Sequence, residues 1–391
     1  MLALQVGQCG NQLGRALFDK LAEEEDAASL SDSVFFRSPE DFCNHRSVNT
    51  RRARAVLIDM EPKVIQQCYK PLNNRKATAA WEYDPKNSFT RQSGSGNNWA
   101  SGYRTQGTQV ETELLDLLQS EAERCDLLKG FLTLQSAAGG TGSGLGTFLT
   151  EKLADFYPST SLLNAVVWPY QSGEVIVQNY NAMLTMASLA DVAHGIFMLQ
   201  NDAANLICQK LLRIPHPSFD AMNGVLAAHL ASSFLAVDDG SACRSGRTLD
   251  PLREICERLC QHPAYKLLDI KMVPLMPHRS KKFSTHSWTG IVKHLHQMQV
   301  ANAASEGGID WDISLTTDHG RTLNRAYDKT GTLISNSKAM LQTLAITMDK
   351  AYDMFSHGAY LHQYERFGVD RDFFQEAFLR IDQITQNYSS L

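Results

Sequence analysis

The sequence has no excess of positive charge and no long hydrophobic run. Its 391 residues include 37 lysine and arginine residues against 42 aspartate and glutamate residues, for a formal net charge of -5. Because binding to nucleic acid usually requires a basic surface, we expect no nucleic-acid partner. The N-terminal segment "MLALQVGQCG" lacks the basic start of a signal peptide, and no apolar stretch is long enough to span a bilayer. We therefore expect a cytoplasmic chain without membrane insertion.

The sequence also lacks closely spaced cysteine pairs of the kind that bind metal ions, and it lacks two common nucleotide-binding motifs. The eight cysteines form no CxxC pair, which is typical of scattered reduced thiols. His294 and His296 have no second cluster that could complete a metal site. There is no GxGxxG loop, and no Gly-Lys-Ser/Thr follows the glycine-rich segment as it does in a Walker A motif. The alternative class of function for a nucleotide-binding fold is an enzyme such as a dehydrogenase or a kinase. The two missing motifs argue against it.

Strand-like and helical segments alternate through the first half of the chain. Short apolar runs predict strands at 2–6, 55–59, 131–135, 162–168 and 196–200. Apolar residues recur at helical spacing between these runs. The alternation predicts an α/β fold with a parallel sheet. A long apolar helix is expected at 218–237, and the polar segment "DDGSACRSGRTLDP" after it marks a domain boundary.

Loops rich in glycine, asparagine or acidic residues follow the predicted strands. They are "GQCGNQLG" from Gly7, "DMEP" from Asp59, "GSGNNWASG" from Gly94 and "SAAGGTGSGLG" from Ser136. Ligands of an open parallel sheet bind at the carboxyl ends of the strands, where these loops should lie. A glycine loop between a strand and a helix can wrap backbone N–H groups around phosphate. The nearby carboxylates of Asp59 and Glu61 can hold hydrated Mg²⁺.

Each loop has a simpler explanation when it is taken alone. A Gly/Ser/Thr loop is more often a tight connection, "DMEP" is also a helix-start signal, and Cys9 is more often a buried small residue than a nucleophile. Because all four loops are expected at the same edge of one sheet, their occurrence together favours a phosphate-binding site over these simpler explanations. Since the first lysine after the glycine loop is Lys152, backbone dipoles and a metal ion would have to neutralise the phosphates.

The four loops resemble the nucleotide loops of the tubulin superfamily. "GQCGNQLG", "GSGNNWASGY", "AGGTGSGLGTFL" and "YNAML" occur in the family's order, and the resemblance covers nearly the whole chain. It implies a nucleotide-binding domain of tubulin GTPase type (1–217) and a long central helix (218–237). A smaller, shortened α/β intermediate domain with an enlarged loop (238–334) and a C-terminal helical hairpin (335–391) would follow.

The resemblance also implies GTP or GDP with Mg²⁺ as ligands and a role for individual residues. The first phosphate loop and base pocket would contain Gln8, Cys9 and Gln12, the magnesium side Asp59 and Glu61, and the γ-phosphate side Asn97. Phosphate would be bound by Ser136, Gly139, Gly140, Thr141, Gly142, Ser143 and Gly144. Glu174 would lie near the ribose, and the guanine pocket would consist of Asn201, Phe219 and Asn223, with an aromatic face for the base and amides for its edge.

Several positions depart from the family pattern. Gln178 stands where polymerising tubulins commonly carry an acidic ribose contact, and Phe219 stands where they carry tyrosine. The loop through which a tubulin reaches the next subunit's nucleotide is enlarged by "SACRSGRTLDPLREICERLC", with Ala264 and Leu267 where acids would activate hydrolysis. The hypothesis is that this chain does not complete hydrolysis on a partner, unless Asp269 or Glu257 substitutes. The stretch 311–335 is short, and the end "QNYSSL" has no acidic run.

Other segments indicate a subtype and a function. "IDMEPKVI", "WPYQSGEVIVQNYNAMLT", "EGGIDWDIS" and "AYLHQYERFG" are most similar to the delta subfamily of centrioles and basal bodies. This implies a structural GTP/GDP-binding protein of the cytoskeleton that acts in triplet-microtubule assembly and ciliogenesis, with other tubulins or centriolar proteins as partners. Whether it hydrolyses GTP stays open. The alternative is a filament-forming GTPase of another tubulin or FtsZ subtype, although FtsZ would share "GGTGSG" but not "GQCGNQ".

Overall fold

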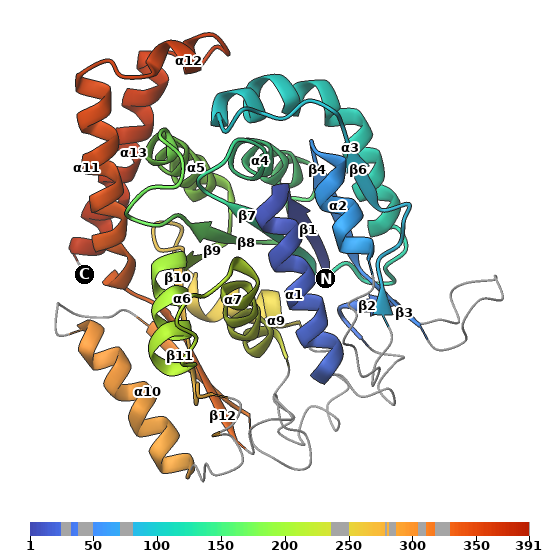
Figure 1. Cartoon of the computed structure of the whole chain (residues 1–391), viewed down its shortest axis with the longest axis vertical. Coiled ribbons are helices and arrows are strands. Elements are labelled where there is room, and N and C mark those ends of the chain that lie inside the picture. Colours follow the sequence, from blue (N-terminus) through green and yellow to red (C-terminus); the bar gives the residue numbers. More distant parts are fainter. Residues whose placement is uncertain are drawn as a thin grey trace.

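A nine-stranded sheet in the order β11-β12-β10-β9-β8-β7-β1-β4-β6 forms the centre of the computed structural model (Figure 1). The structure describes residues 1–24, 33–37, 50–70, 81–235, 250–277, 280, 287–303, 310–316 and 329–390. The strands of the large sheet are β1 Leu2–Val6, β4 Ala55–Asp59, β6 Ser88–Thr90, β7 Gly130–Ser136, β8 Ser161–Trp168, β9 Gly195–Gln200, β10 Leu267–Val273, β11 Asp310–Thr316 and β12 Thr330–Asn336. A smaller sheet pairs β2 Phe36–Arg37, β3 Arg51–Ala53 and β5 Trp81–Glu82.

From β6 to β10 the large sheet is parallel throughout. Ala3 of β1 lies opposite Ala55 of β4, and Leu163 of β8 lies opposite Gly195 of β9. The five predicted strands are all present at their predicted places, so the α/β fold with a parallel sheet is confirmed. Parallel pairing brings the carboxyl ends of these strands to one edge, which is the edge that the predicted loops follow.

The sheet continues past the predicted domain boundary. Leu267 and Leu268 of β10 pair in parallel with Ile196 and Phe197 of β9, and β12 and β11 then add to β10 in antiparallel orientation. One sheet therefore runs through both the proposed nucleotide-binding domain and the proposed intermediate domain. The division of the chain into these domains stays a prediction. Residues 317–328, the middle of the short stretch, lie outside the described residues.

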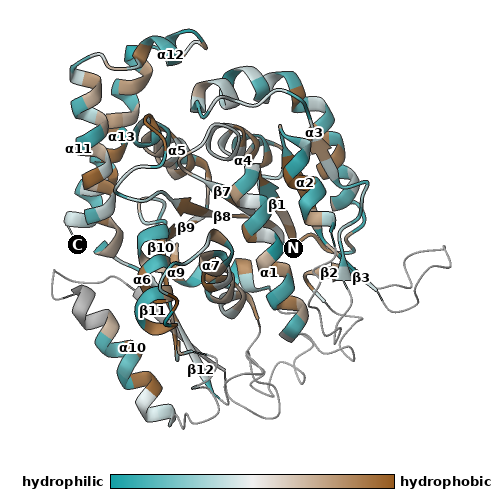
Figure 2. Cartoon of the chain, viewed as in Figure 1, coloured by the Kyte–Doolittle hydropathy of each residue, from teal (hydrophilic) through white to brown (hydrophobic). Residues whose placement is uncertain are grey.

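Helices cover both faces of the sheet. They are α1 Gly7–Glu24, α2 Pro62–Tyr69, α3 Gly107–Ala122, α4 Gly146–Phe156, α5 Gln178–Val192, α6 Asn201–Leu206, α7 Phe219–Phe234, α9 Pro251–Leu259, α10 Trp288–Ala303, α11 Leu341–Ser356, α12 Leu361–Glu365 and α13 Arg371–Ser389, with tight helical turns at Ser101–Gln106, Thr141–Leu145, Ile207–Leu211 and Lys338–Met340. Because strand residues alternate between faces, Ala3 packs with α1 and α7, whereas Leu2 and Leu4 pack with α3 and α4. Figure 2 shows hydrophobic residues on the central strands and the helix faces that cover them. No helix within the described ranges is long and apolar enough to cross a membrane.

The predicted central helix is α7, and part of the predicted enlarged loop is a helix as well. Ser218 caps α7, since its hydroxyl accepts from the Ala221 N–H at 3.3 Å. Residues 236–249, which include most of the polar boundary segment, lie outside the described residues. The prediction that "SACRSGRTLDPLREICERLC" enlarges a loop is wrong for its second half, because Asp250 caps helix α9 and Pro251 occupies its first turn.

The C-terminal hairpin packs against α5 (Figure 1). Its buried side chains, such as Phe374, Phe378 and Ile381, join a cluster with Tyr180 and Met183 of α5. The first of its long helices begins at Leu341. Residues 335 and 336, which were assigned to the hairpin, belong instead to β12, where Ser335 lies opposite Asp269. The described cysteines are free thiols, as expected, and Cys43 and Cys243 lie outside the described residues.

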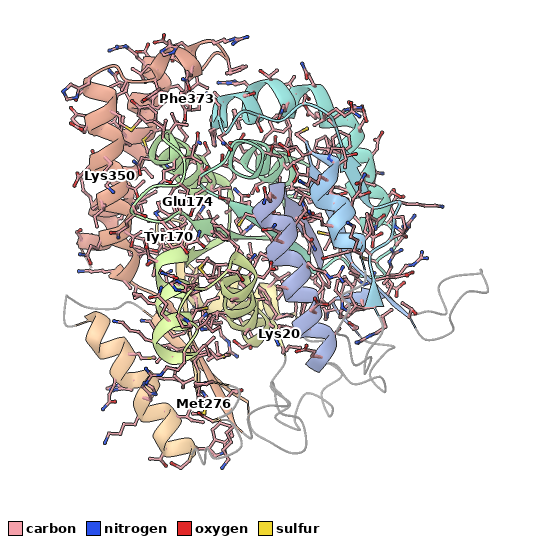
Figure 3. All side chains as sticks on the ribbon, in the orientation of Figure 1. Lys20, Tyr170, Glu174, Met276, Lys350 and Phe373 are labelled. Carbon is pink, nitrogen blue, oxygen red and sulfur yellow. The ribbon has the colours of Figure 1, made fainter. Side chains whose placement is uncertain are left out.

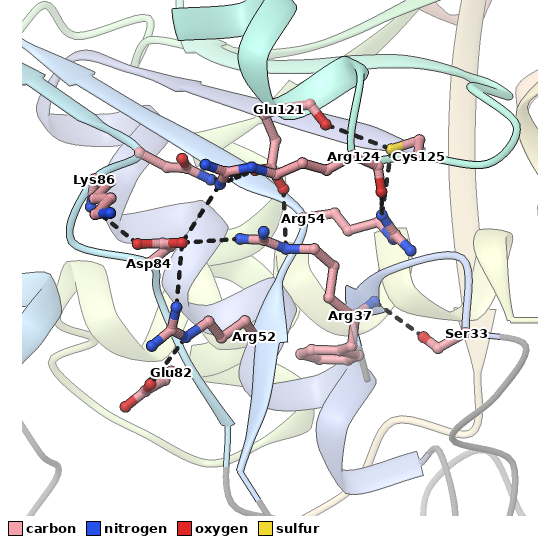
Figure 4. Close-up of polar contacts among 12 residues, drawn as sticks. Ser33, Arg37, Arg52, Arg54, Glu82, Asp84, Lys86, Glu121, Arg124 and Cys125 are labelled. Atoms are coloured by element: carbon pink, nitrogen blue, oxygen red, sulfur yellow. Dashed lines mark hydrogen bonds and ion pairs between the residues drawn. The ribbon is translucent and has the colours of Figure 1, made fainter. Parts of the chain in front are cut away.

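A buried cluster of ion pairs joins the small sheet to the end of α3 (Figure 4). The Arg37 guanidinium contacts Glu121 Oε1 and Asp84 Oδ2, each at 3.2 Å, and all three side chains are at least 95% buried. Arg124 contacts the same two carboxylates, and Asn87 donates to Glu121 Oε2 at 2.7 Å. Burial raises the pKa of Glu121, while the nearby arginines oppose this effect. The cluster connects segments that are far apart in sequence.

Candidate nucleotide site

A cavity of about 390 Å³ opens at the carboxyl ends of the parallel strands. Among the residues that line it are all those assigned to ligand binding from the sequence except Ser143 and Gly144: Gln8, Cys9, Gln12, Asp59, Glu61, Asn97, Ser136, Gly139, Gly140, Thr141, Gly142, Glu174, Asn201, Phe219 and Asn223. The lining contains the three acids Asp59, Glu61 and Glu174, and no lysine or arginine among the described residues. A phosphate in this cavity would therefore depend on backbone N–H groups and on a cation.

The first loop of the cavity is the tight turn from β1 into α1. Gly7 has φ +73°, and a Cβ at this position would lie 2.8 Å from the Gly142 nitrogen of the glycine loop. Only glycine permits both the left-handed backbone and this close approach. The Asn11 amide donates to the Gly7 and Ile58 carbonyls at 2.9 and 3.0 Å, which fixes the turn to the end of β4. Burial and Glu174 raise the pKa of Cys9 to about 12, so its thiol is not a nucleophile at neutral pH.

The glycine loop packs directly against the loop after β6. A Cβ at Gly140 would lie 2.7 Å from the Ser95 Cβ and 2.8 Å from the Asn98 nitrogen. The hydroxyls of Ser95 and Thr141 are 2.6 Å apart and join the same two loops. Ser95 was quoted within "GSGNNWASG" but was not singled out, because a lone serine in a glycine-rich segment carries no distinguishing signal.

Two residues of the glycine loop do not reach the cavity. The Ser143 side chain is fully buried and donates to the Gly139 carbonyl, while the Gly144 N–H donates to the Gly140 carbonyl at 2.8 Å. Their polar groups are thus used inside the turn. The assignment of Ser143 and Gly144 to phosphate contact is not supported by this geometry, and their role is to shape the turn into α4.

The side of the cavity that was assigned to magnesium from the sequence contains a buried carboxyl group with a free oxygen. Asp59 is 4% exposed; its Oδ1 accepts from the Glu61 N–H at 3.2 Å, and its Oδ2 has no hydrogen-bond partner in the structure. Burial raises the pKa of Asp59 to about 6, and the nearby Glu61 adds to this shift. No group of three or more potential ligand side chains gathers within the described ranges. The two acids thus fit Mg²⁺, which keeps several waters and takes only one or two carboxylates.

We expect Asp59→Asn to raise stability and weaken nucleotide binding. The folded chain holds the Asp59 proton more tightly than the unfolded chain, so the contribution of this carboxyl to stability is complete below pH 3.8 and is lost as the pH rises through about 6. At pH 7.5 without Mg²⁺, the variant should be more stable by about 1–2 kcal/mol in thermal melting. Its affinity for Mg·GTP should fall about tenfold or more. A lower melting temperature than that of the wild type would contradict this assignment.

The side of the cavity that was assigned to the base from the sequence combines two amides, an acid and an aromatic ring. Asn201 and Asn223 are buried, while the Phe219 ring is 52% exposed at the start of α7 and free to stack on a flat ligand. The Asn201 amide donates to Glu174 Oε1 at 3.3 Å. In Figure 3, Tyr170 and Glu174 lie side by side, near Lys350 of α11. Lys350 Nζ donates to the carbonyl of Gln171 in the same loop at 2.7 Å.

Gln178 supports the Glu174 loop and does not line the cavity. Its Oε1 accepts from the N–H groups of Glu174 and Val175 at 2.7 and 3.3 Å, and its Nε2 donates to the Tyr170 carbonyl at 2.8 Å. A carboxylate could accept the first two bonds but could not donate the third. The amide at this position therefore closes the loop that presents Glu174, which the sequence alone could not indicate.

The positions compared with the family's hydrolytic acids do not form a loop over a site. Leu267 is 2% exposed within β10, and Ala264 precedes this strand, so aligning them with a catalytic loop was wrong. Asp269 is also in β10, where its carboxylate contacts Lys271 Nζ at 3.2 Å. Glu257 is exposed on α9 and pairs with Arg253 at 2.6 Å. Helix α9 packs where β7 and β8 begin, at the opposite edge of the sheet from the cavity.

Comparison with known proteins defines the class of this site. Residues 1–209 match the Tubulin/FtsZ family, GTPase domain, and this range supplies most of the cavity. The part of this chain that forms the parallel sheet and its glycine loops is thus the GTPase domain of that family.

Similarity over the whole chain narrows the assignment further. The chain is 34% identical to the "Tubulin delta chain" of Canis lupus familiaris and 33% identical to that of Homo sapiens, with 100% of both proteins covered in each comparison. It is 28% identical to the "Tubulin beta-1 chain" of Colletotrichum graminicola, over 99% of this chain and 94% of that protein. The chain belongs to the tubulin family, and the predicted resemblance is confirmed. The alignment with the canine protein spans 457 positions, so this 391-residue chain has gaps relative to it.

Proposed function

We propose that the cavity binds GTP or GDP together with Mg²⁺. The observation that carries this proposal is that residues at the ends of six strands and at the start of α7 line one cavity, with no lysine or arginine among the described lining residues. The glycine loop would present backbone N–H groups to phosphate, and Asp59 would hold the cation that neutralises it. Phe219 would stack on the base, while Asn201 and Asn223 would donate to and accept from its edge.

The protein would act as a structural, delta-type tubulin in this proposal. Its partners would be other tubulins or centriolar proteins, and its place would be the centriole and basal body, in the assembly or maintenance of triplet microtubules and of cilia. Full-length similarity to chains named "Tubulin delta chain" supports this subtype over an FtsZ-type filament protein. Co-localisation of the tagged full chain with a centriole marker would support the role, and a uniform distribution along cytoplasmic microtubules would contradict it.

We expect Asn201→Ala to weaken GTP and GDP binding about two- to tenfold and to reduce the preference for guanine over adenine. The substitution removes a buried amide that can bond to the base edge, which is worth about 0.5–1.5 kcal/mol. Competition of GTP, GDP and ATP against a fluorescent GTP analogue measures both effects.

The matched control is Asn205→Ala in the same helix, α6. Asn205 does not line the cavity, and its Oδ1 accepts from the neighbouring Gln209 Nε2 at 3.4 Å. Its substitution should leave the affinities unchanged. A wild-type protein that binds ATP as tightly as GTP would contradict the assignment of the base pocket.

A further inference from the structure

Asn181 of α5 connects the two loops that enclose the phosphate side of the cavity. Its side chain is fully buried. The Nδ2 group donates to the Asn97 carbonyl at 2.8 Å and to the Ala138 carbonyl at 2.7 Å. Asn97 and Ala138 both line the cavity, the first in the loop after β6 and the second in the glycine loop. One amide therefore sets the separation of these two loops.

The other end of the same amide faces the C-terminal hairpin. Asn181 Oδ1 accepts from the Trp99 N–H at 3.0 Å and from the Tyr364 hydroxyl at 2.7 Å. All hydrogen-bonding positions of the side chain are thus used. Only an amide can donate twice and accept twice here, and the carbonyl partners fix which end carries the nitrogen.

Tyr364 is held in place by aromatic packing between the hairpin and α5. It is fully buried on α12, and its ring packs edge-to-face on Tyr180 and Phe374, with centroids 5.5 and 5.2 Å away. A second bond runs beside it, from the Asn98 amide to the Gln363 carbonyl at 3.2 Å. Phe373 also packs on Trp99, with centroids 5.8 Å apart. The segment 97–99 is thereby joined to the hairpin at two places directly and at a third through Asn181.

We propose that Asn181 is a positioning residue of the nucleotide site and that Tyr364 orients it, so that the C-terminal hairpin and the phosphate loops are energetically coupled. The inference rests on the proposed binding of GTP or GDP. A nucleotide that orders the two loops also orders Asn181, and through Tyr364 it tightens the packing of the hairpin. Because such coupling is reciprocal, loosening the hairpin at Tyr364 weakens nucleotide binding.

The test compares Tyr364→Phe with Tyr180→Phe in the full chain. Each variant removes one buried hydroxyl, since the Tyr180 hydroxyl donates to the Ala359 carbonyl of the hairpin at 3.0 Å. Both substitutions loosen the hairpin, but of the two hydroxyls only that of Tyr364 donates to the Asn181 side chain. GTP and GDP affinities are measured by titration with fluorescent analogues. Hydrogen exchange of residues 359–374 is measured with and without added GTP.

We expect Tyr364→Phe to weaken nucleotide binding about three- to tenfold, the range for loss of one hydrogen bond, and Tyr180→Phe to change it less than twofold. Added GTP should slow exchange in 359–374 in the wild type and in Tyr180→Phe, and less so in Tyr364→Phe. Equal affinities in the two variants overturn the positioning role while nucleotide binding stands. A wild-type chain that binds neither GTP nor GDP overturns the proposed function and this inference together.

Discussion

Gly140→Ala is expected to weaken GTP and GDP binding about 100-fold while most of the fold remains intact. The new Cβ would lie 2.7 Å from the Ser95 Cβ and 2.8 and 2.9 Å from the Asn98 nitrogen and oxygen, distances that real side chains do not show. Two of these three atoms belong to the backbone, so a rotamer change cannot relieve the clash. The glycine loop and the loop after β6 must separate, at a cost of about 3 kcal/mol that appears in binding.

Gly224→Ala is the control for this prediction. Gly224 lies within α7, next to Asn223, and a Cβ there would have no atom within 4 Å. Alanine is the better helix former by about 1 kcal/mol, so this variant should melt at the same or a higher temperature and bind normally. Titration of both variants with a fluorescent GTP analogue measures and compares their affinities for the nucleotide. Wild-type affinity in Gly140→Ala would mean that the contact between the two loops does not shape the binding site.

Glu121→Ala should have the largest effect on stability, a loss of about 3 kcal/mol or more. The carboxylate is fully buried and contacts Arg37, Arg124 and Asn87. Removing it leaves Asp84 as the carboxylate that contacts the buried Arg37. Removal of one partner of a buried ion pair typically costs about 3–5 kcal/mol. The midpoint of guanidinium unfolding and the melting temperature should both fall.

Glu123→Ala, two residues further along the chain, provides the comparison for Glu121→Ala. Glu123 is exposed, and its carboxylate accepts a surface hydrogen bond from Gln119 Nε2 at 2.7 Å. Its loss should change stability by no more than about 0.5 kcal/mol. If the two variants unfold at the same denaturant concentration, the ion cluster of Figure 4 does not stabilise the join between the small sheet and α3.

The central strands and most cavity residues could be predicted because their signals are local. An apolar run such as 162–168 is buried on both faces, and a parallel sheet brings the segment after each run to one edge. Once Gly7, Asp59 and Gly140 follow successive strands, their meeting in space requires no further information. The same logic could not separate Gly142, which lines the cavity, from Gly144, whose N–H is used inside the turn.

What could not be predicted depends on contacts between distant segments. Asn181 and Tyr364 meet across 183 residues, and Arg37 and Glu121 meet through elements whose sequences show no shared pattern. Gln178 was compared with an acidic contact at its position, whereas its role depends on the carbonyl of Tyr170, which only the folded loop reveals. The alignment at Leu267 failed for a related reason: the segment that was interpreted as an enlarged loop contains helix α9, and Leu267 begins strand β10.

The most direct test of the account is the identity of the nucleotide released from protein that is purified under native conditions and then denatured. If the cavity is a guanine-nucleotide site, chromatography should recover GTP or GDP at close to one molecule per chain, with less from Asn201→Ala and Gly140→Ala. Recovery of an adenine nucleotide, or of no nucleotide from a folded chain that also fails to take up added GTP with Mg²⁺, would contradict the central claim.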